Sequence, residues 1–223
     1  MQKYKTDWYL YYLINVTLII LVSFPIYWAF VSSIKQPDEL ITNTPTLFPK
    51  NPTFESYERI WNLEPTSSRG NIRSAFMNSA IVSIGTVVVS AVISTLAAYA
   101  LTILRTPFRH FIFLLIIMPI LIPGISLLIP LYKLVRELGL MNSYLGLILI
   151  HSTGMLTLGV FLMRNAFMSI PTSLREVALL EGSSELRILF TVMLPLAIPG
   201  LLTLMVFALY SAWNDFILAF LFV

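Results

Sequence analysis

The stretch SAFMNSAIVSIGTVVVSAVISTLAAYALTIL, residues 74–104, contains no charged side chain and decides the fold class. An α-helix needs about 20 mostly apolar residues to cross the roughly 30 Å hydrocarbon layer of a membrane. The stretch shows no alternation of polar and apolar residues, which excludes a strand of a membrane β-barrel. We therefore predict a transmembrane helix here.

Four further uncharged runs of similar length occupy residues 8–34, 110–132, 138–163 and 188–214. Charged residues make up 11% of the chain and hydrophobic residues 57%, whereas soluble proteins carry about 25% charged residues. This composition excludes a soluble domain, a disordered chain and a nucleic-acid-binding protein, and the absence of cysteine excludes a disulfide-stapled secreted module. The predicted fold class is an all-α integral membrane protein with five spans.

The spans divide the chain into three predicted parts. Residues 1–34 form an N-terminal tail and an anchor helix, residues 35–73 a proline-rich loop, and residues 74–223 the membrane core. Lysine and arginine are equally divided between the two sides of the predicted membrane, so their distribution does not orient the chain. A long loop is translocated largely regardless of its charge, which favours an external loop and a cytoplasmic N-terminus.

Two features of the loop and of the second span predict contacts. Within the loop, Thr53 is a candidate N-cap for a short amphipathic helix, which either lies on the membrane surface or docks an external partner. In the second span, small side chains recur every four residues and predict close helix packing, within this chain or against a second subunit. These residues are Thr86, Ser90, Ser94 and Ala98.

Prolines interrupt the third span at positions 119, 123 and 130. Each proline removes a backbone hydrogen bond, and inside a membrane the freed carbonyl must be buried in protein or reached by water. The pattern therefore predicts either a broken helix beside a water-filled route or a simple kink.

The segment RNAFMSIPTSLREVALLEGSSELR, residues 164–187, is the longest charged stretch of the core. Pro171 ends the preceding helix, and Ser173 with Glu176 three residues later is the pattern of a capping box that starts another. Gly182 is suited to end this second helix, and a further helical run begins at Ser184. We predict two short helices joined at a glycine.

This segment resembles the EAA loop of the permease subunits of binding-protein-dependent ABC importers. The family pattern is Glu-Ala-Ala, three residues, Gly, nine residues and Ile-x-Leu-Pro, and every spacing is kept here. The matching residues are Glu176, Ala178, Gly182, Leu194 and Pro195. Val177 and Val192 replace an alanine and the isoleucine, and Glu181 replaces an aspartate that often precedes the glycine.

The remainder of the chain is similar to the MalG-like subunits of carbohydrate importers, through Asn78-Ser79, Pro52-Thr53 and Trp213-Asn214-Asp215-Phe216. The resemblance implies the type I ABC importer fold with six spans, in a multi-pass protein of the prokaryotic inner membrane. It implies that the loop at about 171–190 docks on a cytoplasmic ATPase dimer. It also implies a second homologous permease subunit and an external substrate-binding protein as partners.

The resemblance implies no catalytic residue, metal or cofactor in this chain, with ATP hydrolysed by the partner. The sequence agrees, since it has no G-x-x-x-x-G-K-[ST] phosphate-binding loop. The chain ends at Val223, after five predicted spans, where the family continues to a sixth. Either the subunit is truncated or it is a natural variant with its C-terminus outside, and we favour truncation because a missing sixth helix would expose part of the pathway.

Polar residues within the predicted spans are candidates for a translocation route. They are His151, Asn214 and Asp215, and we expect the last helix to continue past Asp215. A charged side chain at the centre of a bilayer costs about 3 kcal/mol, so it usually faces a cavity or a partner. These residues either line the route or make structural hydrogen bonds between helices.

Two other functional classes share some of these features. Ser126 and His151 provide the residue types of an intramembrane serine protease, but the sequence supplies no oxyanion hole. A subunit of a secondary transporter or channel for a polar solute would have similar hydropathy, but it would not need two cytoplasmic helices joined at a glycine. An ABC importer permease is the favoured interpretation.

Overall fold

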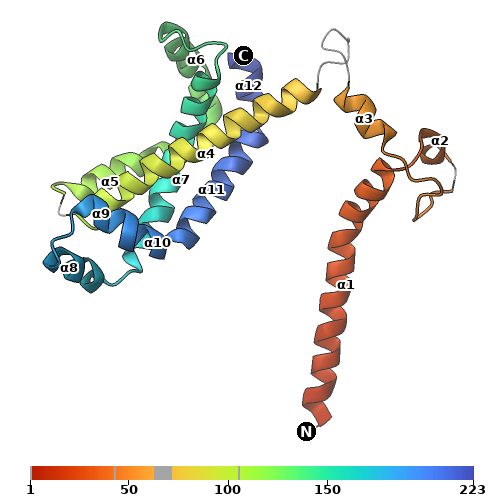
Figure 1. The fold of residues 1–223 in the computed structure, drawn as a ribbon, viewed down its shortest axis with the longest axis horizontal. Helices are drawn as coiled ribbons and strands as arrows, with labels where there is room; N and C mark the ends of the chain where they lie inside the picture. Colours follow the sequence, from red (N-terminus) through yellow and green to blue (C-terminus); the bar gives the residue numbers. More distant parts are fainter. Residues whose placement is uncertain (1, 43, 63–71, 105) are drawn as a thin grey trace. The chain divides into compact units, whose positions relative to one another are not determined.

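The computed structural model describes residues 2–42, 44–62, 72–104 and 106–223 (Figure 1). Pro65 of the predicted proline-rich loop lies outside these ranges. The described residues form helices and connecting segments without a β-strand. They group into two compact units, Met1–Ser74 and Ala75–Val223, which we describe separately.

The first unit is built around helix α1 (Gln2–Ser33), whose segment Trp8–Ser33 is long and apolar enough to cross a membrane. Only 6% of its most apolar window is buried, so nearly all of its apolar side chains are available to lipid. Short helices α2 (Pro37–Leu40) and α3 (Glu55–Trp61) follow. Helix α3 is the predicted amphipathic helix, but its N-cap is Phe54, and Thr53 instead accepts a 3.2 Å hydrogen bond from the Glu55 N–H.

The segment between α1 and α3 is held by two charged side chains. Lys35 is 3% exposed, donates to the Thr46 carbonyl, and lies 4.7 Å from the ring centre of Trp28. The Glu39 carboxylate accepts from the Thr46 hydroxyl at 2.6 Å and from the Lys50 N–H at 3.1 Å. The hydrogen bond from Thr46 is the main reason that the pKa of Glu39 lies below its usual value.

The second unit contains two straight spanning helices, α4 (Ile72–Thr102) and α7 (Tyr144–Met168), with α11 (Ile198–Trp213) packed against α7 (Figure 1). Helices α6 and α12 lie at one end of this bundle and α8 at the other (Figure 1). We call these the α12 end and the α8 end. With α1, three helices are long enough to span, or five spans if each bent pair described next counts as one.

The third predicted span is broken. Helix α5 (Arg109–Ile117) continues into the 3₁₀ turn η1 (Met118–Leu121), and η2 (Gly124–Leu127) leads into α6 (Leu128–Glu137). The two halves meet at 98°. Pro119 and Pro123 lie at this break, where their missing N–H groups interrupt the helical hydrogen bonds. The segment is therefore a broken helix and not a simple kink.

The fifth span is also bent, by 81°, where we predicted one continuous helix. Helix α9 (Glu185–Ile188), the π-helix η3 (Leu189–Met193) and α10 (Leu194–Leu196) precede α11. The Leu194 N–H bonds to the Leu189 carbonyl, five residues earlier, directly before Pro195. The bend itself lies at Ala197, between α10 and α11, where Pro199 in the first turn of α11 has no N–H to continue the helical hydrogen bonds.

Helices α4 and α7 approach each other through small residues. The four small side chains predicted on α4, namely Thr86, Ser90, Ser94 and Ala98, are all at most 1% exposed. A Cβ atom added to Gly159 of α7 would lie 2.3 Å from the Ser94 Oγ, so no larger residue fits there. This face is packed within the chain and is not a free surface for a second subunit.

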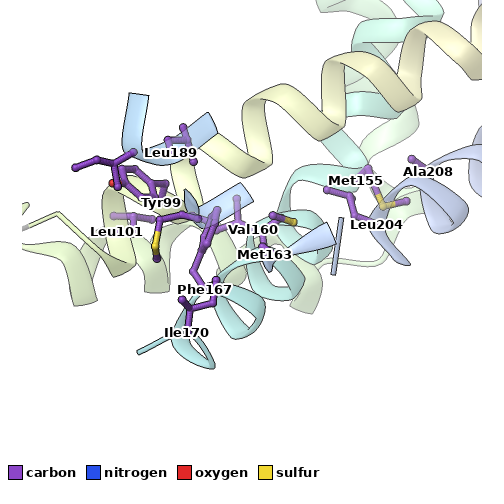
Figure 2. Packing of buried hydrophobic residues seen from close by; sticks show 14 of the residues in the cluster. Tyr99, Leu101, Met155, Val160, Met163, Phe167, Ile170, Leu189, Leu204 and Ala208 are labelled. Atoms are coloured by element: carbon purple, nitrogen blue, oxygen red, sulfur yellow. The ribbon is translucent and has the colours of Figure 1, made fainter. Parts of the chain in front are cut away.

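Larger side chains from several elements complete the core. Tyr99 and Leu101 of α4 lie beside Leu189 of η3 at one end of the cluster, whereas Met155, Leu204 and Ala208 lie at the other (Figure 2). Phe167 of α7 is fully buried, and its ring meets the Tyr99 ring edge-on, with the centroids 5.6 Å apart. The core therefore extends to the α8 end, where it meets the charged segment.

Candidate functional site

Helix α8 (Thr172–Leu180) is the first of the two short helices predicted at this end. It begins two residues earlier than the predicted capping box allows. Pro171 is its N-cap, with extended backbone angles, and no side chain caps it. Ser173 and Glu176 therefore stand inside the helix and cannot form the box, which requires the N-cap and third helical positions.

The two sides of α8 differ in exposure. Ala178 is its one buried side chain and belongs to the main core cluster. Glu176 and Val177 are exposed, and Leu180, on the side opposite Ala178, is 88% exposed. The small Ala178 thus brings α8 close to the chain's own core. The side opposite the core carries exposed apolar and acidic side chains.

Gly182 ends α8 as the sequence predicts. Its φ is +81°, a left-handed conformation that favours glycine. The Gly182 N–H bonds to the Leu179 carbonyl and the Ser183 N–H to the Ala178 carbonyl, both at 3.0 Å. This pair of bonds is a Schellman motif, which turns the chain sharply toward α9. Glu181 is the exposed C-cap residue before the turn.

A polar network links the two short helices to the bundle, and sequence reasoning did not find it. Arg175 of α8 donates through its Nε, at 3.2 Å, and through a terminal nitrogen to the two carboxylate oxygens of Glu185 in α9. The Tyr99 hydroxyl of α4 donates to the same carboxylate at 2.8 Å. The hydrogen bond to Glu185 raises the pKa of Arg175 above its usual value.

The remaining predicted residues of this segment lie further along the fifth span. Leu194 is partly buried against the main core cluster, and Pro195 is exposed, one residue later in α10. They follow the π-helix directly. The predicted EAA residues thus run from an exposed helix, through a tight turn, to the bend in the span.

The polar residues predicted for a translocation route come together at the α12 end. The His151 Nε2 lies 3.8 Å from the Asp215 Oδ2, and the imidazole is nearly fully buried. We predicted that the last helix continues past Asp215, and this prediction is wrong. The helix ends at Trp213, and the Asp215 carboxylate accepts from the N–H groups of Leu218 and Ala219 at 3.0 and 3.1 Å. These bonds satisfy two N–H groups in the first turn of α12 (Ile217–Phe222), whose N-cap residue is Phe216.

Asn214 also serves a helix end, since its side-chain amide donates to the Tyr210 carbonyl at 2.9 Å. Across the described ranges no group of three or more His, Asp or Glu side chains could hold a metal ion. The α12 end therefore presents helix caps and one buried His–Asp pair. The α8 end presents an exposed helix tied to the core through charges.

Residues 90–223 match the family described as "Binding-protein-dependent transport system inner membrane component". The chain belongs to this permease family. The match covers both bent spans and the whole of the segment from α8 to α10. The permease is therefore a subunit of an ATP-driven ABC importer and a multi-pass inner-membrane protein, which excludes the protease and secondary-transporter interpretations.

Relatives of the permease support the same family. It is 34% identical to the sulfoquinovosyl glycerol transport system permease protein SmoH of Agrobacterium fabrum, over 88% of this chain and 67% of that protein. It is 33% identical to the probable starch degradation products transport system permease protein AmyC of Thermoanaerobacterium thermosulfurigenes, over 98% of this chain and 77% of that one.

A solved structure shares the fold of the permease. It is the crystal structure of a bacterial ABC transporter involved in the import of the acidic polysaccharide alginate. The TM-score is 0.82 at 24% identity, over 100% of this chain and 76% of the other. The all-α importer fold predicted from the sequence is thereby confirmed. An importer of this kind works with an ATPase and a substrate-binding protein.

Proposed function

We propose that the permease forms half of the translocation pathway of a carbohydrate importer. The names of its relatives support this substrate class, since they refer to sulfoquinovosyl glycerol and to starch degradation products. A second homologous permease supplies the other half, an external binding protein delivers the solute, and a cytoplasmic ATPase dimer drives alternating access. The permease itself catalyses no reaction and uses no cofactor.

The exposed side of α8 is the surface that docks on the ATPase. The observation that carries this proposal is Leu180, which is 88% exposed on a helix outside the candidate spans. An apolar group displayed in this way, beside Val177 and Glu176, favours an interface with another protein. The N-terminus is then cytoplasmic, because an odd number of spans separates it from the loop before α4 and an even number from α8.

The His151–Asp215 pair has a supporting role in the translocation route. The Asp215 carboxylate is used by two N–H groups of α12 and lies close to His151 of α7. Asn214 likewise satisfies a carbonyl at the end of α11. These residues fix the helices around the route instead of binding the solute.

A pair of matched substitutions tests the docking surface. Leu180→Asp adds a negative charge at an apolar position on the exposed side of α8, and Glu176→Lys reverses a charge there. For each variant we expect about tenfold less ATPase to copurify with the tagged permease complex. The control is Ile41→Asp, which alters a comparably exposed aliphatic side chain, 84% exposed, in the loop between α2 and α3.

The control should retain the full amount of ATPase, because its loop lies on the other side of the membrane in the proposed orientation. Unchanged ATPase in both α8 variants would refute the docking surface. Loss of ATPase in the Ile41→Asp variant as well would mean that the assay reports general misfolding.

A further inference from the structure

The strongest arrangement that the importer family does not by itself explain is the network of Tyr99, Arg175 and Glu185. It joins three elements, because Tyr99 belongs to α4, Arg175 to α8 and Glu185 to α9. We infer that this network is a strut that fixes α8 to α4, and that Tyr99 is a positioning residue for coupling to the ATPase. The inference rests on the proposed docking of α8.

Packing alone holds α8 weakly. Its one buried side chain is Ala178, a single methyl group. The helix is entered through Pro171, in extended backbone conformation, and left through Gly182, in the left-handed one. Neither turn continues a helix, so neither transmits a bending force along a hydrogen-bonded rod. Helix α8 therefore needs additional contacts to keep its angle to the membrane helices.

The carboxylate of Glu185 supplies those contacts. One oxygen accepts from a terminal nitrogen of Arg175, and the other accepts from both the Arg175 Nε and the Tyr99 hydroxyl. A two-point arginine–carboxylate contact fixes direction as well as distance. The side chains of Arg175 and Glu185 are 24% and 36% exposed, so water weakens the ion pair as a source of stability. Its value here is geometric.

Tyr99 anchors the network to the bundle. The residue is 4% exposed, and its ring meets that of Phe167 from α7. Figure 2 shows it in the core beside Leu189 of η3. Because this ring cannot shift without disturbing the core, a displacement of α8 moves α4 and α7 with it. The hydroxyl is the one atom through which the buried ring reaches the carboxylate.

The chain allows a clean test because it contains no cysteine. Spin labels attached to Leu174→Cys on α8 and Val88→Cys on α4 would report the distribution of distances between these helices in the complete importer. Leu174 precedes Ala178 by four residues and so lies on the same side of α8, away from Leu180. Val88 is 55% exposed. The distribution separates α8 attached to α4, at the distance seen in the structure, from α8 detached from α4.

Tyr99→Phe removes only the hydroxyl and keeps the ring. We expect the ratio of attached to detached α8 to fall about tenfold, which is the effect of losing a hydrogen bond to a charged acceptor. The matched control is Tyr144→Phe. The Tyr144 hydroxyl donates to the Asn78 Oδ1 at 2.8 Å and also joins α4 to α7, but at the α12 end. This variant should leave the distribution unchanged.

Charge exchange provides a second variant set. Arg175→Glu alone should detach α8 from α4 to at least the same degree. Addition of Glu185→Arg should restore most of the attached population, because the opposite charges face each other again. The rescue shows that the two charges act as a pair, and the distance between α8 and α4 shows that the pair acts as a strut. Amounts of ATPase that copurify with each variant are measured in parallel.

The outcomes separate the two proposals. Identical distance distributions for the wild type and the Tyr99→Phe variant would overturn the strut, as would equal broadening by Tyr144→Phe. If the wild-type permease retained no ATPase, the proposed docking would fail, while the distances would still show whether α8 is fixed to α4.

Discussion

The two ends of the α4–α7 pair use the same chemical group for different purposes. At the α8 end the Tyr99 hydroxyl donates to a carboxylate, and at the α12 end the Tyr144 hydroxyl donates to the neutral amide of Asn78, both at 2.8 Å. The first acceptor belongs to a third element, and the second to a helix that is already packed against α7. The Tyr144 bond therefore links two helices within the bundle, whereas the Tyr99 bond links the bundle to α9 and, through Arg175, to α8.

The two hydroxyl groups act on one rigid body only if α4 and α7 stay packed between these ends, and Gly159→Leu would disrupt that packing. The new side chain would meet the Ser94 Oγ at 2.3 Å and the Leu204 Cδ1 at 2.9 Å at its first atom. We expect a loss of about 3 kcal/mol in the free energy of unfolding. Denaturation of the purified permease in detergent would measure it.

The control lies on the same helix. A Cβ added to Gly154 would meet nothing within 4 Å, so Gly154→Leu should unfold like the wild type. Equal destabilisation by the two leucines would show that helix composition, and not the close approach of α4 to α7, limits stability.

A smaller effect sharpens the contrast between the two ends. Gly182 and Gly139 both have left-handed backbones, with φ of +81° and +68°, and a Cβ atom added to either would meet nothing within 4 Å. Alanine at either site should cost about 1 kcal/mol in unfolding free energy. Under the proposed docking, only Gly182→Ala should also lower the amount of ATPase that copurifies, because this turn sets the angle of α8. Equal ATPase retention in both variants would contradict the contrast.

An effect of similar size concerns Asp215 at the α12 end. Asp215→Ala removes the acceptor for two N–H groups in the first turn of α12 and should lower the unfolding free energy by about 1 kcal/mol. The side-chain oxygen of asparagine can accept the same bonds, so Asp215→Asn should recover most of this loss although it removes the charge beside His151. Comparing the unfolding curves of Asp215→Ala and Asp215→Asn decides whether Asp215 acts by accepting hydrogen bonds or by its charge. Two equally destabilised variants would mean that the charge, and not the hydrogen bonds, is what matters.

Sequence patterns predicted the positions of the spans well but predicted the bends within them less well. The uncharged runs identified five membrane segments because burial in lipid excludes charge along a whole helix. The clustered prolines predicted a break or a kink in the third span without deciding between them, and the structure shows the break. The bend near Pro195 escaped prediction, because prolines at positions 195 and 199 are also typical of helix starts, and nothing in the sequence indicates a π turn.

The site was predictable where its signal was local. Gly182 and its fixed distance from Glu176 identified the turn and the resemblance. The partners of Glu185 were beyond reach, since Arg175 is ten residues away across a turn and Tyr99 is 86 residues away. Asp215 misled the prediction because an apolar run follows it, which suits one long helix as well as a capped new one.

The π-helix η3 has a consequence for register. A turn closed between residues five apart holds one residue more than an α-helical turn, and each residue of an α-helix turns the chain by about 100°. Compared with a regular α-helix through the same residues, the extra residue therefore offsets the phase of α9 from that of α10 by about that angle. A substitution that closed η3 as an α-helical turn without changing the chain length would rotate Glu185 away from Tyr99, whereas deleting one residue from Leu189–Met193 would remove the extra residue and keep the phase.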